Sequence, residues 1–298
     1  MPKNPYNLTP QVLKGSLPVA VGDVIFVDSG DGNVNGDGSS LRPFSTIEAA
    51  FNKSGLSDTD TIVVMPGHTE DVAGAAGINA DVAGVTVLGL GTGSKRPTVT
   101  FSATASTVAV AATSITFDNL IFDLTGIDAV VIGIDVNSDN FTMRNCRVIM
   151  ADSTGQSVTG VDINGGSANT CDNTTIENCE FLGSADAGAD EAIELGEVAD
   201  NVQIKGCTVT GDYANACIHN ITGKVMTNLV IRDCILKNDQ TGDHSIELVS
   251  ACTGFLIGNY YHNDMTQATG ADTGSCHSFE CYHCDVIDKS GIISPAVT

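Results

Sequence analysis

The sequence has no tryptophan and few basic residues. Among its 298 residues, 13 Lys and Arg stand against 36 Asp and Glu, which gives a formal net charge of −23. A surface of this sign repels nucleic acid and other anionic polymers, so we expect no nucleic-acid partner. Aromatic residues are also scarce, with 10 Phe and 5 Tyr, and few rings are therefore free to form platforms for sugar rings.

Long apolar runs are missing as well. A membrane-spanning helix needs about 20 consecutive apolar residues, and the sequence contains no run of that kind, so we expect no membrane association. The first residues, Met1-Pro-Lys-Asn-Pro-Tyr6, lack the basic, apolar and small-residue order of a secretory signal. We therefore expect a chain that is made in the cytoplasm and carries no export signal.

One eight-residue phrase recurs along the chain. Its clearest copy is Phe141-Thr-Met-Arg-Asn-Cys-Arg-Val148. The copies follow one another at intervals of roughly 26 to 33 residues, which is typical of solenoids, propellers and other repeat arrays. Further copies begin at Val85, Ile115, Thr174, Val202, Leu229 and Phe255.

Each position of the phrase has a physical role. The first and third residues are mostly apolar and share one face of a short strand. The fifth is Asn, Asp or Gly, residues that tolerate a left-handed backbone and suit a corner. The sixth points into the interior, where we expect a ladder of reduced cysteines rather than a row of disulfides. In the last five copies the sixth residues are Cys146, Cys179, Cys207, Cys234 and Tyr260.

A second alternating segment lies between the phrases and predicts another short strand. Three short strands per repeat, stacked in parallel on those of the next repeat, form a parallel β-helix. The alternative is a β-sandwich of hairpins, which would not keep the same corner residue in register. We therefore predict an all-β, single-stranded β-solenoid. The outward residues of the second strand are Asp135, Asp162, Glu194, His219 and Glu247.

The chain divides into four parts around the predicted coil, which spans residues 61–264. Residues 1–22 contain prolines and predict an extended N-terminal arm. Residues 23–60 form a cap, in which the capping box Ser45-Thr-Ile-Glu48 begins a short helix over the open end of the coil. Residues 265–298 form a C-terminal segment that is either a final rung or an interface tail.

Two segments carry residue types that bind metals. Asp31, Asn33 and Asn35 hold alternate positions of a calcium-loop pattern, but Arg42 stands where that loop has Glu, so we favour a glycine-rich turn. Near the C-terminus, Cys276, Cys281 and Cys284 could offer thiolates to zinc, but only the last two have the usual spacing of a pair. We favour a final rung or an interface segment there over a zinc site, and we expect no metal and no cofactor.

The outward carboxyl groups predict a column along the coil. Strands stack about 4.8 Å apart, so Asp162 and Glu194 on adjacent rungs could supply the close carboxyl pair of a retaining glycosidase, with Glu247 as a further alternative residue. Against catalysis stand the missing tryptophan, the lack of cations beside the column, and repeat lengths without a long insertion to build a cleft wall. We favour a solvated acidic face.

The N-terminal motifs bring a family resemblance. Pro43-Phe-Ser-Thr-Ile-Glu-Ala-Ala50 and Asp60-Thr-Ile-Val-Val-Met-Pro-Gly67, preceded by the glycine-rich loop, resemble the cap of pectate-lyase-like right-handed β-helix proteins. The version most similar is common among bacteriophage virion proteins, including tailspikes and capsid-decorating proteins. The resemblance covers residues 24 to about 264. These residues are structural, so no catalytic residue is carried over.

The resemblance implies a structural virion protein without enzymatic activity, on the surface of a bacteriophage particle and made in the host cytoplasm. It would decorate and stabilise the capsid. It also implies a homotrimer that binds the major capsid protein or another virion component. The alternative is a tailspike-like polysaccharide depolymerase, a glycoside hydrolase that uses the carboxylate pair. A third possibility, from the loop at Asp31, is a calcium-dependent adhesin.

Overall fold

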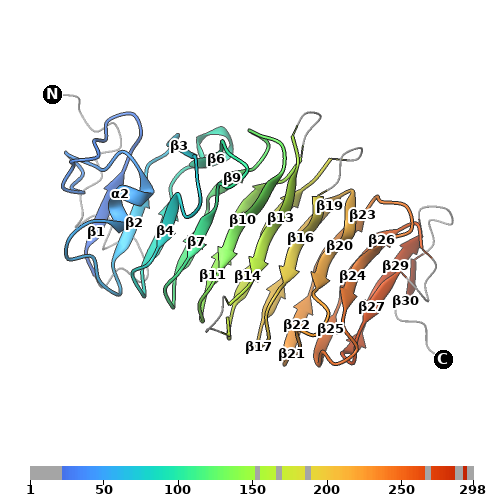
Figure 1. Ribbon diagram of the computed structural model, residues 1–298. Coiled ribbons are helices and arrows are strands. Elements are labelled where there is room, and N and C mark those ends of the chain that lie inside the picture. Colours follow the sequence, from blue (N-terminus) through green and yellow to red (C-terminus); the bar gives the residue numbers. More distant parts are fainter. Residues whose placement is uncertain are drawn as a thin grey trace.

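The computed structural model describes residues 22–151, 155–165, 170–184, 189–265, 270–285 and 291–293. They form an elongated stack of rungs with the N-terminal and C-terminal parts at opposite ends (Figure 1). Three long sheets of ten, eight and ten strands run through the stack. The predicted all-β solenoid is confirmed. Among the residues described, no helix has the length and apolar character needed to cross a membrane.

Each complete rung gives one strand to each long sheet, as predicted, and all pairs are parallel except the last one, β29 with β30. The first sheet contains β1 (Val24–Val27), β2 (Thr61–Val64), β5 (Thr86–Gly89), β8 (Thr116–Asp118), β11 (Thr142–Arg144), β14 (Thr175–Glu177), β18 (Gln203–Lys205), β22 (Leu229–Arg232), β25 (Gly254–Ile257) and β28 (His277–Phe279). The second contains β3 (Thr69–Val72), β6 (Thr98–Phe101), β9 (Ile121–Asp123), β12 (Arg147–Ile149), β15 (Glu180–Leu182), β19 (Thr208–Gly211), β23 (Ile235–Asn238), β26 (Tyr260–Asn263), β29 (Tyr282–Asp285) and β30 (Gly291–Ile293).

The third sheet has the longest strands. It contains β4 (Ile78–Ala80), β7 (Val108–Val110), β10 (Val130–Val136), β13 (Ser157–Ile163), β16 (Ala189–Leu195), β20 (Tyr213–Asn220), β24 (His244–Leu248) and β27 (Ala271–Thr273). Two short strands, β17 (Ala199–Asp200) and β21 (Met226–Thr227), pair at a corner, and a 3-10 helix, η1, spans Gly93–Lys95.

The corner between the first and second sheets is a column of left-handed residues. Its backbone angle φ is 58° at Asn119, 54° at Asn145 and 52° at Asn178. Asparagine adopts this conformation more readily than most other residues, so the predicted fifth-position corner is confirmed. The column continues with positive φ at Gly206, Asp233, Gly258 and Glu280.

The last copy of the phrase is displaced by one residue from its predicted frame. Val230 pairs with Phe255, so the copy begins at Gly254. The residue at the interior sixth position is therefore Asn259, which is fully buried. The prediction of an interior Tyr260 is wrong, because this side chain is 53% exposed.

A ladder of thiols follows the corner column inside the coil. All ten cysteines are free, including the four for which a reduced ladder was predicted, Cys146, Cys179, Cys207 and Cys234. The Sγ atom of Cys179 lies 3.3 Å from the carbonyl oxygen of Glu177 in its own rung. Hydrogen bonds with the neighbouring thiols of Cys146 and Cys207, together with burial, raise the pKa of Cys179 well above its usual value. This residue therefore stays a thiol at neutral pH.

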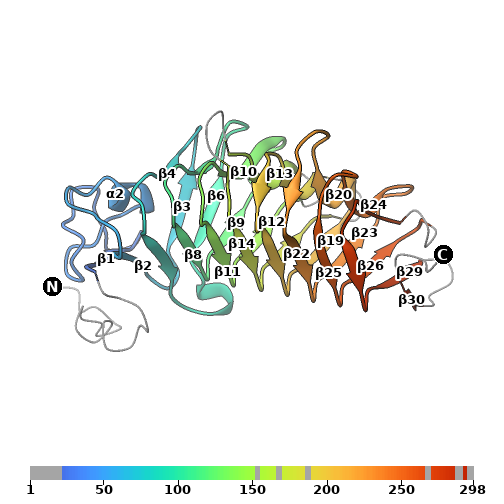
Figure 2. The same ribbon diagram turned by 90° about the horizontal axis from the view of Figure 1, so that it is seen from below.

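A short helix, α2 (Ile47–Phe51), lies at the N-terminal end of the stack (Figure 2). Ile47, Ala50 and Phe51 belong to the same core cluster as the coil interior. Its N-cap is Thr46, whose Oγ1 atom accepts a hydrogen bond of 3.1 Å from the amide of Ala49. The predicted capping box at Ser45 is thus displaced by one residue. Residues 1–21 of the predicted arm and parts of the C-terminal segment lie outside the described residues.

Candidate functional site

The carboxyl column lies on the third sheet. Backbone pairing aligns Asp135 with Asp162, Asp162 with Glu194, and Glu194 with His219. His219 then pairs with Glu247 on the next strand. Figure 1 shows the strands β10, β13, β16, β20 and β24 side by side. Parallel neighbours are about 4.8 Å apart, so the structure brings the predicted side chains into one continuous row.

Asp162 is the most enclosed member of this row. It is only 5% exposed, so the expectation of a solvated acidic face is wrong at this position. The facing rung has Gly196, where a Cβ atom would lie 2.4 Å from Oδ1 of Asp162. This Oδ1 atom has no hydrogen-bond partner among the described residues. Burial, followed by the charges of Glu194, Asp135 and Glu191, raises the pKa of Asp162 to about 8.

Glu194 is the immediate neighbour of Asp162 and is partly buried. Burial, followed by the charges of Glu191 and Asp190, raises its pKa to about 7. Glu247 is different, because its side chain is 41% exposed and it lies two strands away from Glu194. The three predicted catalytic alternatives therefore separate into an adjacent pair and a more distant third group.

A second group of residues beside the row did not emerge from the sequence. Glu191 is 3% exposed and aligns with Thr159 on the preceding strand. Its carboxylate accepts a hydrogen bond of 2.5 Å from Oγ1 of Thr159 and one of 2.7 Å from Nδ2 of Asn215. Between β16 and β20 the register shifts near Ala189 and Glu191. Strict alternation breaks down at such an irregularity, which is why the outward position of Glu191 could not be read from the pattern.

His219 connects the two groups. Its Nδ1 atom lies 3.6 Å from Oε2 of Glu191, and its Nε2 atom lies 3.9 Å from Oε2 of Glu247. One possible ligand atom each from Glu191, Glu194 and His219 lie within 4.8 Å of one another. Within the described part of the chain, no Lys or Arg forms an ion pair with any carboxylate of this cluster. The arrangement can therefore exchange protons between carboxyl groups or surround a cation.

The loop that carries the weaker alternative of a calcium site is an exposed turn. Asp31, Asn33 and Asn35 are all exposed, and Oδ1 of Asn33 accepts a hydrogen bond of 2.8 Å from the amide of Asn35. Arg42 lies 3.4 Å from Asp37, in an ion pair across the loop. These contacts describe an exposed, glycine-rich turn.

The three cysteines considered as alternative zinc ligands take separate places in the last rung. Cys281 is fully buried and follows the left-handed corner at Glu280, so it extends the thiol ladder. The Sγ atom of Cys276 lies 3.7 Å from the carbonyl oxygen of Cys252, and Cys284 lies in β29. Because β28 and β29 pair with the preceding strands, this part of the C-terminal segment continues the coil.

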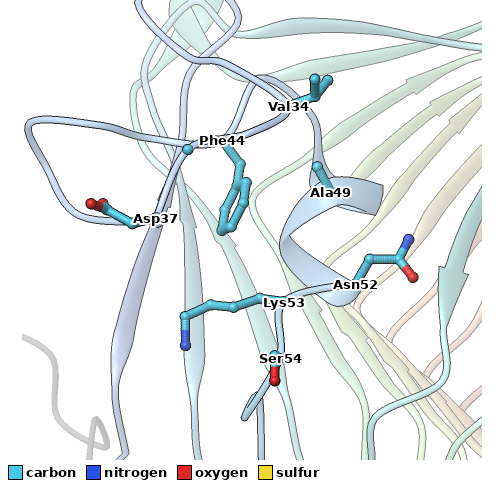
Figure 3. Close-up of a pocket in the computed structure, with 8 residues that line it drawn as sticks. Val34, Asp37, Phe44, Ala49, Asn52, Lys53 and Ser54 are labelled. Carbon is cyan, nitrogen blue, oxygen red and sulfur yellow. The ribbon is translucent and has the colours of Figure 1, made fainter.

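Two cavities lie away from the carboxyl row. The first, of about 550 Å³, lies at the N-terminal end between the glycine-rich loop and α2. Figure 3 shows Phe44 between this loop and the helix, with Lys53 and Asp37 at its edge. The only charged residues in its lining are Asp37 and Lys53, and neither adjoins the row.

The second cavity, of about 400 Å³, is lined by Tyr260 and Tyr282 together with the corner residues Asp233, Gly258 and Glu280. The two tyrosine rings are stacked, with centroids 5.6 Å apart. Exposed rings thus do gather on the last rungs, contrary to the expectation from composition.

Comparisons with known proteins identify no family for this chain. No protein-family model matches the chain, and no curated protein matches it. Among solved structures, it is similar to the pectate lyase Pel9A, with 14% identity, a TM-score of 0.48, and coverage of 88% of this chain and 77% of that one. It is also similar to a GH136 lacto-N-biosidase from Eubacterium ramulus, with 10% identity, a TM-score of 0.44, and coverage of 93% and 70%. The native form of that biosidase gives a TM-score of 0.35, 10% identity, and coverage of 87% and 67%.

The expectation that the chain is not an enzyme is not upheld, since the solved structures to which it is similar are a lyase and a glycosidase, both of them enzymes. The pectate-lyase-like β-helix resemblance is supported at the level of the fold. At this level of identity the likeness shows the fold alone. Any chemistry assigned to this chain must therefore come from its own side chains.

Proposed function

We propose that the chain is a glycoside hydrolase that acts on a polysaccharide through the carboxyl pair Asp162 and Glu194. The observation that carries the proposal is their direct pairing on adjacent parallel strands, at the positions that point away from the core. Carboxyl groups about 5 to 5.5 Å apart are typical of retaining glycosidases. The strand spacing of about 4.8 Å is close to that separation.

The environments of the two groups suggest their roles. Asp162 is almost completely enclosed, and burial disfavours its charged form, so it suits the acid that protonates the leaving oxygen. Glu194 is more exposed and can approach the anomeric carbon as the nucleophile. After the glycosyl group is attached to Glu194, the ionised Asp162 would take a proton from the attacking water.

The charges around the pair favour an uncharged substrate. No Lys or Arg of the described residues is paired with these carboxylates, and His219 is the basic group beside them. A polysaccharide rich in uronic acids would meet repulsion from the row and from the net charge of −23. Neutral glycans bring hydroxyl groups, which can donate hydrogen bonds to the carboxylates.

Hydrolysis of a panel of neutral polysaccharides tests the proposal, with new reducing ends as the readout. Asp162→Asn and Glu194→Gln should each lower the rate by at least 100-fold. Asp272→Asn is the matched control, since Asp272 continues the same row on β27 but is exposed, and it should keep the wild-type rate. Absence of new reducing ends across the panel, or equal rates for all variants, would overturn the assignment.

The virion setting remains a prediction from the sequence resemblance. It places such a depolymerase on the surface of a bacteriophage particle, as a homotrimer that contacts the major capsid protein or another virion component. Co-sedimentation of the purified protein with particles that lack it tests the location, and light scattering tests the trimer. A monomer that stays in the supernatant would remove both predictions without affecting the hydrolysis proposal.

A further inference from the structure

We propose that Glu191, Glu194 and His219 form a binding site for one divalent transition-metal cation of the zinc type. This inference goes beyond glycan hydrolysis and holds whether or not the chain cleaves sugars. The three residues come from the adjacent strands β16 and β20 of the third sheet. The site would therefore be built on rigid elements rather than on loops.

The geometry leaves room for one ion. Since the three ligand atoms lie within 4.8 Å of one another, they are no more than about 2.8 Å from a common centre. Zinc ligands from histidine and carboxylates lie at about 2.0 to 2.2 Å. Closing on an ion thus needs movements of less than about 1 Å, which small rotations of the side chains provide.

Neighbouring residues hold one ligand in place. Glu191 is 3% exposed, and Thr159 and Asn215 each donate a hydrogen bond to its carboxylate. Each carboxylate oxygen has two lone pairs, so these bonds leave acceptor capacity for a metal. Outer hydrogen bonds of this kind orient the ligands of metal sites and are part of their affinity.

Two buried polar atoms without a hydrogen bond give independent support for a cation. Asp162 is only 5% exposed and is paired in register with Glu194 on the adjacent strand. Its Oδ1 atom has no hydrogen-bond partner among the described residues. Nδ1 of His219 is also buried without a hydrogen bond. Buried polar atoms are normally satisfied. A dication between Glu191, Glu194 and His219 would supply the missing partner for the imidazole and offset the crowded negative charge beside Asp162.

The donor set selects the type of metal. Calcium and magnesium are bound by oxygen ligands. An imidazole nitrogen with two carboxylates suits zinc and other first-row transition metals better. An ion bound here would be coordinated by Glu194, the proposed nucleophile. Metal binding would therefore lower any hydrolytic activity.

Calorimetric titration of the full chain with zinc sulfate tests the proposal, after treatment with a chelator and dialysis, and in the absence of any glycan. We expect one zinc per chain, and a ten-fold excess of calcium should not displace it. His219→Ala and Glu191→Gln should each weaken binding at least 10-fold, and Glu191→Gln retains a side chain of the same size in case the alanine variant folds poorly. His244→Ala, which changes a histidine on the neighbouring strand β24 outside the three ligands, should bind like wild type.

Other outcomes would overturn the site. Less than 0.1 zinc per chain would show that no ion binds. Equal zinc binding by wild type and His219→Ala, with loss in Cys276→Ser or Cys284→Ser, would assign the metal to the C-terminal thiols. Because no sugar is present, either result is separate from failure of the hydrolase proposal. Circular dichroism of each variant shows that the coil is folded.

Discussion

Replacing Asp162 by Asn should remove a pH-dependent loss of stability. The pKa of this carboxyl is raised from 3.8 to about 8 in the folded chain, first by burial and then by Glu194 and its other acidic neighbours. In the unfolded chain it ionises at its ordinary value. Between these two pKa values the unfolded state binds fewer protons than the folded state, so the free energy of unfolding falls as pH rises.

The magnitude follows from the size of the shift. Each pKa unit corresponds to about 1.4 kcal/mol, so ionising Asp162 in the folded chain costs about 6 kcal/mol at full extent. Below about pH 4 both states are protonated and this cost is absent. Asparagine resembles the protonated acid and does not ionise, so the variant should gain stability over wild type from about pH 4 up to about pH 8. Above that pH the difference should stay constant.

Urea unfolding followed by circular dichroism at pH 4, 6, 7.5 and 9, in the presence of a chelator, measures this difference. The control is Asp272→Asn, at an exposed position of the same row, which should follow wild type at every pH. The carboxyl groups that do not interact with Asp162 titrate alike in all three proteins, so their contributions to the difference cancel. If the curves of wild type and Asp162→Asn stay parallel between pH 4 and pH 9, the carboxyl is not enclosed as the structure shows.

Three further predictions follow from the coil and the site. Cys179→Asp should destabilise the chain by several kcal/mol, because it places a carboxyl inside the thiol ladder; a melting temperature within two degrees of that of the outward control Thr175→Asp would contradict the interior assignment. Asn145→Ala should cost about 1 kcal/mol more than Asn145→Gly in urea unfolding, because φ at this corner is 54°; equal stabilities would show that the corner is not strained. Hydrolysis should be fastest between about pH 7 and pH 8, where Glu194 is ionised while Asp162 is still protonated; a rate that rises steadily towards pH 5 would exclude these roles.

The sequence was sufficient to predict the coil, because a β-helix repeats its physical constraints in every rung. The corner needs a left-handed residue, and Asn, Asp or Gly recurs there. The row of Asp162, Glu194 and His219 was predictable for the same reason. Each of these residues lies between two residues that point inward, and side chains alternate strictly along such a short strand segment. Where two adjacent residues both suit the left-handed corner, the prediction failed. Gly258 and Asn259 both suit a corner, so the last copy was placed one residue late.

The site as a whole was less accessible from the sequence. The hydrogen bonds of Glu191 with Thr159 and Asn215 depend on a shift of register between two strands, which no local pattern specifies. The burial of Asp162 depends on the glycine of the next rung. Both are properties of neighbouring rungs acting together, and neither belongs to a single strand. A solvated acidic face and an enclosed acid therefore show the same alternation of apolar and polar residues in the sequence, and the pattern alone cannot tell them apart.

Because the rungs are equivalent, the order in which they are stacked decides which ionisable side chains are neighbours in the carboxyl row. Gln203 of β18 aligns with Val230 of β22, so excision of residues 203–229 removes one complete layer and leaves each remaining layer an equivalent neighbour. Glu194 would then meet Glu247 in place of His219, while the thiol of Cys179 would meet that of Cys234. Losing, copying or shuffling whole layers can thus exchange the ionisable partners on the surface while the interior keeps its pattern. Such a scaffold can acquire new combinations of side chains without a new core.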